Sequence, residues 1–142
     1  MKRYVLILSQ YFLKGHPKEG NHTEFHRKYV EGSKIHTIRT NYDFWKSRIE
    51  EINKGYAYLS IRIWEGKPYR SKKYEFARLY EAGIQKIQFK DLSRKANVEG
   101  KLIDLPLLSK NDGLDFNDFF YWFKSYNLKE PLAIIHFTQF RY

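Results

Sequence analysis

The chain has 142 residues, 42% of them hydrophobic, with 12 Tyr, 11 Phe and 3 Trp, so residues 1–142 can form a single domain with a core of its own. The absence of cysteine excludes disulfides, thiolate nucleophiles and cysteine-based zinc sites, and no apolar run is long enough to span a bilayer. Lys and Arg exceed Asp and Glu by 26 to 16, and the resulting charge of +10 favours nucleic acid as a partner. We therefore expect a cytoplasmic protein without a membrane partner.

The first third of the chain predicts a strand followed by two helices. Residues 4–9 form a short apolar run rich in strand formers, and residues 14–21 form a loop that contains Gly and Pro. A first helix is predicted to begin at an Asn21 cap, with Glu24 three residues later, and to end at Gly32. A second helix is predicted over residues 43–53, with three side chains toward the core, namely Phe44, Ile49 and Ile52.

The remaining elements are mostly strands. Residues 57–64 (AYLSIRIW) alternate between apolar and other side chains, which predicts a strand with one buried face, and residues 65–68 (EGKP) form a turn. Residues 74–80, 85–89 and 97–103 are further strand candidates, and residues 132–140 form the last strand. Asp115 caps a helix with an apolar stripe of Phe116, Phe119, Phe120 and Phe123. Helices inserted among antiparallel strands indicate the α+β class, with a small β-barrel.

A cluster of polar residues follows the first predicted helix. The segment GSKIHTIR, residues 32–39, resembles the G-x-K-x-x-T-x-R signature of ASCH domains in the PUA-like superfamily. The segments KGHPKEGNHTEF, NDGLDFNDFFYWF and IIHFTQFRY are similar to those of small bacterial and phage-type ASCH-like proteins. The resemblance implies a PUA-like pseudo-barrel of five or six mostly antiparallel strands, with helices around one mouth and a cleft lined by the motif.

The same resemblance implies two alternative functions for the cleft. ASCH-like proteins bind RNA or nucleosides, and here the cleft would be formed by Lys34, Thr37, Arg39 and Asp112. Others are metal-independent amidohydrolases that deacetylate acetylated cytidine nucleosides with a lysine, a threonine and a glutamate. Lys34 and Thr37 match the first two of these catalytic residues, and Asp112, one methylene shorter, stands for the glutamate. A lysine in a low-dielectric cleft can act as base for a threonine hydroxyl, and Arg39 can stabilise the oxyanion.

A structural explanation of the same residues competes with catalysis. Lys34 and Asp112 can form a partly buried ion pair, with Thr37 bonded to backbone. In a regular strand, His36 faces the same side as Lys34 and Thr37 faces away, whereas a tight turn after Gly32 would bring Lys34 and Thr37 into one cleft. The sequence alone leaves both arrangements open.

Other residues suggest a nucleic-acid surface and no metal site. Aromatic and cationic side chains occur together at positions 62–70, and we predict nucleic-acid or ligand binding by His36, Arg39, Arg62, Trp64 and Arg70, with Arg141 and Tyr142 as further candidates. The alternative is a solvated basic strand face with Trp64 packed under a helix. The five histidines lack zinc-type spacing apart from His22 and His26, an i, i+4 pair typical of a solvated helix face, so we expect no metal and no cofactor.

Overall fold

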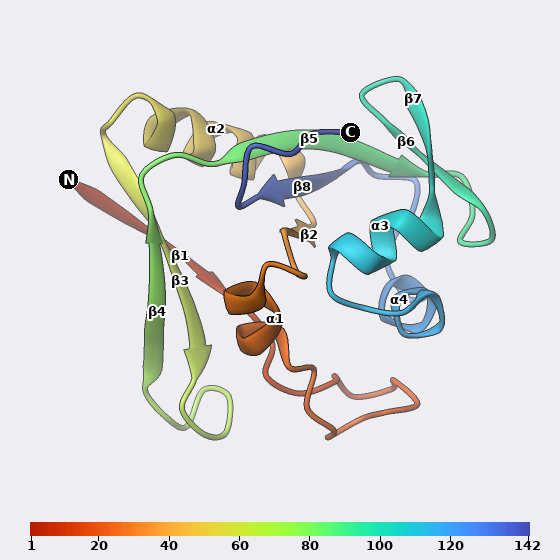
Figure 1. Ribbon diagram of the computed structural model, residues 1–142, viewed down its shortest axis with the longest axis horizontal. Helices are drawn as coiled ribbons and strands as arrows, with labels where there is room; N and C mark the ends of the chain where they lie inside the picture. Colours follow the sequence, from red (N-terminus) through yellow and green to blue (C-terminus); the bar gives the residue numbers. More distant parts are fainter.

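The computed structural model describes residues 1–142 and contains eight strands and four helices (Figure 1). One sheet has the order β1-β3-β4, with strands Lys2–Ile7, Ala57–Trp64 and Lys73–Leu79, in which β1 runs parallel to β3. The other sheet is antiparallel and has the order β2-β8-β5-β6-β7, with strands His36–Arg39, Leu132–His136, Gly83–Phe89, Lys95–Val98 and Lys101–Asp104. The helices are α1 (Phe25–Glu31), α2 (Tyr42–Asn53), α3 (Leu105–Asn111) and α4 (Phe116–Phe123). The α+β class is confirmed, and the two sheets are separate and are not closed into one barrel.

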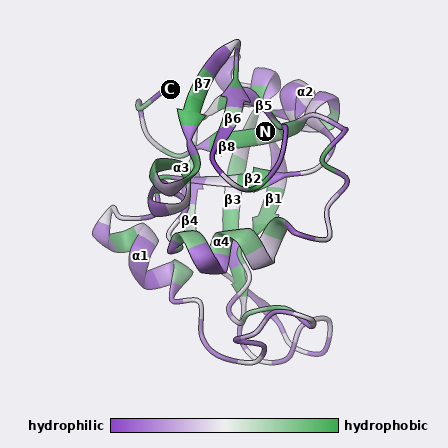
Figure 2. Ribbon diagram, turned by 90° about the vertical axis from the view of Figure 1, so that its right-hand side faces the viewer, coloured by the Kyte–Doolittle hydropathy of each residue, from purple (hydrophilic) through white to green (hydrophobic).

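Both sheets contribute to a single hydrophobic core of 26 buried residues. In Figure 1, β3 and β4 run down the left-hand side, β5 and β8 run across the top, and α3 and α4 lie below their right-hand ends. Helix α2 contacts β3 of one sheet and both β5 and β8 of the other, so it joins the two sheets. Hydrophobic positions are concentrated on the strands and on α4, whereas the long loops are mainly hydrophilic (Figure 2). No helix combines the length and the apolar character needed to cross a membrane.

The predicted helices are present, with corrections at their N-termini. Helix α2 begins at Tyr42, because the Asn41 side chain accepts a hydrogen bond from the Phe44 N–H at 3.2 Å. The expectation that Phe44 faces the core was wrong, since Phe44 is exposed and Trp45 shares the buried face with the predicted Ile49 and Ile52. Helix α1 ends at Gly32 as predicted, but its N-cap is Glu24 and not Asn21.

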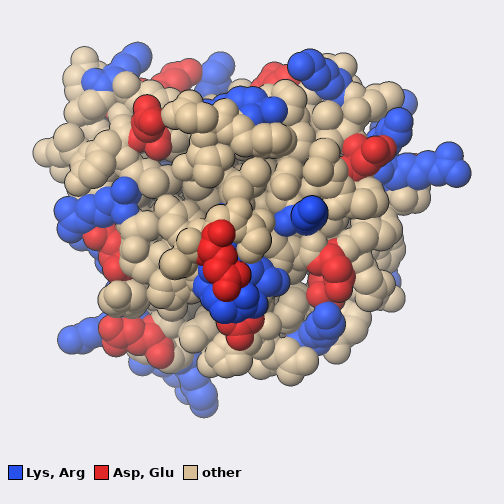
Figure 3. Space-filling model, viewed as in Figure 1, with Lys and Arg blue, Asp and Glu red and all other residues tan.

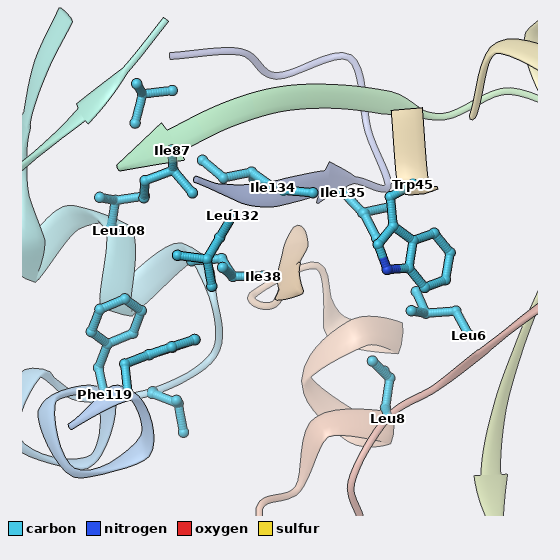
Figure 4. Close-up of a cluster of buried hydrophobic side chains, with 14 of the residues drawn as sticks. Leu6, Leu8, Ile38, Trp45, Ile87, Leu108, Phe119, Leu132, Ile134 and Ile135 are labelled. Atoms are coloured by element: carbon cyan, nitrogen blue, oxygen red, sulfur yellow. The ribbon is translucent and has the colours of Figure 1, made fainter. Parts of the chain in front are cut away.

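Three parts of the second half differ from the expectation. The last strand was expected over residues 132–140, but β8 ends at His136. The single strand predicted over residues 97–103 is the hairpin β6–β7, because Glu99 and Gly100 adopt φ values of 50° and 86° and form a two-residue turn. Helix α3 was not predicted at all. Helix α4 is confirmed, with the Asp115 carboxylate accepting from the Asp118 N–H at 2.7 Å and with Phe119 in the buried cluster of Figure 4.

Candidate functional site

The motif of residues 32–39 begins where α1 ends. Gly32 adopts φ 81°, and the N–H groups of Ser33 and Lys34 both bond to the carbonyl of Lys28 at 2.9 and 3.0 Å. The chain then extends, with the N–H of Ile35 donating to the carbonyl of Asn111 at 2.9 Å. The motif is thereby fixed between the last residue of α3 and strand β8, with which β2 pairs.

Three predicted site residues meet in a buried ionic cluster. The Lys34 ammonium donates to the backbone carbonyl of Asp112 at 2.7 Å and lies 3.3 Å from its Oδ1. His36 Nδ1 lies 3.2 Å from the same carboxylate oxygen. The exposed fractions of Lys34, His36 and Asp112 are 2%, 0% and 4%. The Lys34 ammonium also lies 4.1 Å from the centroid of the Phe25 ring, which adds a cation–π contact.

Gly113 permits the close approach that this cluster needs. Its φ is +83°, and a Cβ at this position would lie 3.1 Å from Cβ of Lys34. The carbonyl of Gly113 accepts from the Lys28 ammonium at 2.6 Å. Asp112 and Gly113, which follow α3, therefore position the side chains of Lys28 and Lys34.

We predict that Gly113→Ala lowers the free energy of unfolding by about 2 kcal/mol or more, because it combines a left-handed backbone with a crowded Cβ. Gly100→Ala is the matched control, since Gly100 has φ +86° and no heavy atom within 4 Å of its added Cβ. We expect the control to lose only about 1 kcal/mol. Urea denaturation compares the two variants, and equal losses would contradict the crowding at Lys34.

The protonation states of the cluster follow from its burial. Burial lowers the pKa of Lys34 to about 8, against the opposing effect of Asp112. Burial also lowers the pKa of His36, so this imidazole is neutral at pH 7, and its Nδ1–H donates to the carboxylate because a carboxylate only accepts. His36 Nε2 then accepts from the hydroxyl of Tyr142 at 2.5 Å, and Asn111 Nδ2 donates to the same hydroxyl oxygen at 3.0 Å.

Thr37 and Arg39 do not join this cluster. Thr37 is buried, but its hydroxyl makes no hydrogen bond to Lys34 or to Asp112, as expected for a regular extended backbone. The Arg39 guanidinium donates to the carbonyl of Ile7 at 2.6 Å, its Nε is buried without a partner, and burial lowers its pKa. Arg39 is thus bonded to backbone and does not line a cleft around Asp112. None of the main surface pockets is lined by Lys34, His36, Thr37 or Asp112.

Two residues next to Tyr142, Gln85 and His136, were not predicted as site residues. Gln85 Oε1 accepts from His136 Nε2 at 2.9 Å and from the Tyr142 N–H at 3.0 Å, while Gln85 Nε2 donates to the Tyr142 carbonyl at 3.2 Å. Burial lowers the pKa of His136 to about 3, and its Nδ1 has no hydrogen-bond partner. Gln85 lies in β5, where polar and apolar residues are mixed, and His136 is the last residue of β8, so neither position stands out in the sequence.

A second group of predicted residues lies at the β3–β4 tip, which we define as residues 64–73. The Trp64 and Tyr69 rings lie 5.2 Å apart, Tyr69 is 90% exposed, and the Lys73 ammonium lies 5.4 Å from the Trp64 ring. Arg70 is exposed, whereas Arg62 is held by its bond to Ser60 Oγ at 2.8 Å and its ion pair with Glu75 at 3.5 Å.

Lys and Arg side chains project from the lower left edge of Figure 3, where the β3–β4 loop lies in Figure 1. Four cations of the tip are exposed, namely Lys67, Arg70, Lys72 and Lys73. The tip therefore combines accessible rings with cations. The planes of the Trp64 and Tyr69 rings are tilted by 50° to each other.

The expectation that His22 and His26 share a solvated helix face was wrong, because His22 precedes α1 and His26 is half-buried. His22 packs on Tyr11 with ring centroids 4.6 Å apart, and His26 packs on Phe76 at 4.2 Å. No group of three or more His, Cys, Asp or Glu side chains is arranged to hold a metal ion.

Comparison of the chain with protein-family models, with curated proteins and with solved structures found no match. The ASCH resemblance therefore stands on the motif segments alone.

Proposed function

We propose that this protein binds single-stranded RNA through the β3–β4 tip. The observation that carries this function is the contact of the exposed Tyr69 ring with the half-buried Trp64 ring, beside four exposed cations of the tip. Unpaired bases stack on aromatic side chains while cations contact the phosphates, and both interactions tolerate sequence variation. The net charge of +10 adds long-range attraction for a polyanion.

We further propose that the chain is an ASCH-like, PUA-like domain of the cytoplasm, on the basis of the motif at residues 32–39. In such a domain the two sheets, joined by α2, would correspond to the two halves of a small barrel. The Lys34–Asp112 pair would tie the motif to the segment after α3, at the position that the resemblance gives to the ligand cleft.

Binding is better supported than amide hydrolysis. Hydrolysis by a threonine needs a base within hydrogen-bond reach of the hydroxyl, about 3 Å. The Lys34 ammonium donates instead to Asp112, and the Thr37 hydroxyl bonds to neither residue. The arrangement therefore lacks the contact between nucleophile and base.

We expect Tyr69→Ala to weaken RNA binding by about 5-fold to 150-fold, the effect of removing one stacking ring. Fluorescence anisotropy with a labelled single-stranded 12-mer measures the dissociation constant. Tyr56→Ala is the matched control, because Tyr56 is 66% exposed and precedes β3 at the end opposite the tip. Equal affinities of both variants and the wild type would contradict binding at the tip.

The dependence of the RNA affinity on salt concentration gives the number of cations that contact phosphates. Four phosphate contacts give a slope of about −2.8 in log affinity against log salt, because each contact to a single strand contributes about −0.7. Affinity should therefore fall about 50-fold between about 50 mM and about 200 mM salt. Lys67→Ala combined with Arg70→Ala should halve the slope, and an unchanged slope would place the contacts elsewhere.

A further inference from the structure

A surface cavity lies between the loop that follows β1 and the C-terminal end of α4. The loop passes below α4 in Figure 1. The cavity has a volume of about 460 Å³, which is within the range of small-molecule sites. It shares no residue with the β3–β4 tip or with the buried ionic cluster. Its lining combines apolar or aromatic side chains with two lysines, namely Leu13, Tyr121, Trp122 and Tyr126 with Lys14 and Lys124.

The buried His16 side chain fixes the loop against α4. Its Nδ1 accepts from the N–H of Lys18 at 3.0 Å, and its Nε2 donates to the carbonyl of Asp118 at 3.1 Å. The Lys18 ammonium also donates to the Asp118 carboxylate at 2.7 Å, which adds a second bond between the loop and the helix. These bonds hold the two walls of the cavity in place without a ligand, so binding requires little ordering of the protein.

The apolar part of the lining offers a contact surface for a flat ring. Trp122 is half-buried, and its ring centroid lies 5.9 Å from that of Phe12 and 5.6 Å from that of Phe25, so core rings hold it in place. Leu13 and Tyr121 are 51% and 36% exposed. Aromatic side chains pack well against another ring, either offset or edge to face. The ring of a ligand can therefore bury apolar surface that the protein itself leaves accessible.

The charged part of the lining is cationic. Lys14 and Lys124 are exposed, and neither pairs with a carboxylate. The Lys124 ammonium lies 5.5 Å from the centroid of the Tyr121 ring. The carboxylate of Glu19 in the same loop accepts from the N–H of Gly15 at 2.9 Å. Two unpaired ammonium groups beside an apolar lining favour a ligand that joins a ring to an anionic group.

We propose that this cavity binds a small aromatic acid, a molecule in which a flat ring carries a carboxylate. The ring packs against Trp122 and Tyr121, and the carboxylate accepts charge-assisted hydrogen bonds from Lys14 and Lys124. The net charge of +10 attracts such an anion to the protein. The proposal does not depend on RNA binding at the β3–β4 tip, because the two sites have no residue in common.

Indole-3-acetate is the probe, titrated into the protein and followed by two-dimensional NMR. The indole N–H signal of Trp122, assigned with Trp122→Phe, should shift with a dissociation constant of about 1 mM or tighter, as expected for a ligand of this size. Indole-3-acetamide is the matched control ligand, because it keeps the ring and lacks the charge. It should bind at least about 5-fold more weakly than indole-3-acetate.

Lys14→Gln combined with Lys124→Gln should weaken indole-3-acetate binding at least about 5-fold and leave indole-3-acetamide binding unchanged. Lys46→Gln combined with Lys54→Gln is the matched control, since it removes the same charge from two exposed lysines at α2. This control should bind both ligands as the wild type does. Tyr121→Ala removes a ring of the lining and should weaken the binding of both ligands.

Four outcomes would overturn the proposal. The first is no binding of indole-3-acetate by the wild type, and the second is equal binding of the acid and the amide. The third is an equal loss of affinity in the two double lysine variants, which would mean that only the net charge matters. The fourth is tighter binding of adenosine 5′-monophosphate than of indole-3-acetate, which would make the cavity part of an RNA-binding surface.

Discussion

Replacing Asp112 with asparagine should lower the free energy of unfolding by about 3 to 5 kcal/mol at neutral pH. The substitution keeps the shape of the side chain and removes its charge, so the Lys34 ammonium remains buried with no anion beside it. The cost of an unpaired buried charge exceeds the gain from the original pair, which explains the large expected loss. Urea denaturation monitored by tryptophan fluorescence measures the change.

The pKa of Lys34 determines how the destabilisation caused by Asp112→Asn changes with pH. The pKa of Lys34 is about 8 in the folded protein and about 10.5 in the unfolded chain, so the unfolded chain binds more protons between these values. Stability therefore rises with pH through this window, by roughly 3 kcal/mol for this group. Without the carboxylate the folded pKa of Lys34 falls further, and the loss caused by Asp112→Asn should be smaller at about pH 10 than at pH 7. The free energy of unfolding of Lys34→Met, measured in the same buffers, gives the pH dependence that comes from the other titrating groups, and this contribution is subtracted.

Two further variants test the cause of the loss. Asp104→Asn is the control, because its carboxylate is 70% exposed and 3.9 Å from Lys95, and it should lose about 1 kcal/mol or less. Lys34→Met added to Asp112→Asn should recover part of the stability, since it removes the unpaired charge. Additive losses in the double variant would mean that the pair does not interact as the 3.3 Å distance indicates.

The second large effect is expected in the core. Phe119→Ala should lower the free energy of unfolding by about 3 to 5 kcal/mol, because the ring is fully buried and leaves a cavity between Phe89 and Phe123. Thermal and urea denaturation both report the change.

Tyr121→Ala on the same helix is the control for this substitution. Tyr121 lies on the exposed side of α4, so its loss should cost about 1 kcal/mol or less. Similar losses for both variants would contradict the assignment of Phe119 to the core face.

The elements that could be predicted are those with strong local signals. Helix α4 combines an Asp115 cap with an apolar stripe, and β3 alternates over eight residues, so local chemistry and tertiary packing agree. Glu99 at φ 50° offers no recognisable hairpin signal, since that position usually holds Asn, Asp or Gly, and β6 and β7 were therefore joined into one strand. Helix α3 has only seven residues, too few for a clear period.

The candidate site could be predicted only in part from the sequence. Lys34 and His36 are two positions apart in an extended segment, so their common side follows from strand geometry. The contact of Asp112 with Lys34 was suggested by the ASCH resemblance and not by a local pattern, and the contact of Asp112 with His36 was not predicted. The bonds from Tyr142 to Gln85 and His36 span 57 and 106 residues, and no local propensity encodes such contacts.

The position of β8 also sets the order in which the chain can fold during synthesis. This strand follows all the others in the sequence, yet it lies between β2 and β5, and its residue His136 pairs with His36 and with Gly83. Until the ribosome has made residues 132–136, β2 and β5 each carry an open hydrogen-bonding edge, and such edges pair with other chains. The nascent protein thus depends on rapid arrival of its last strand, and delayed synthesis near residue 130 should increase aggregation.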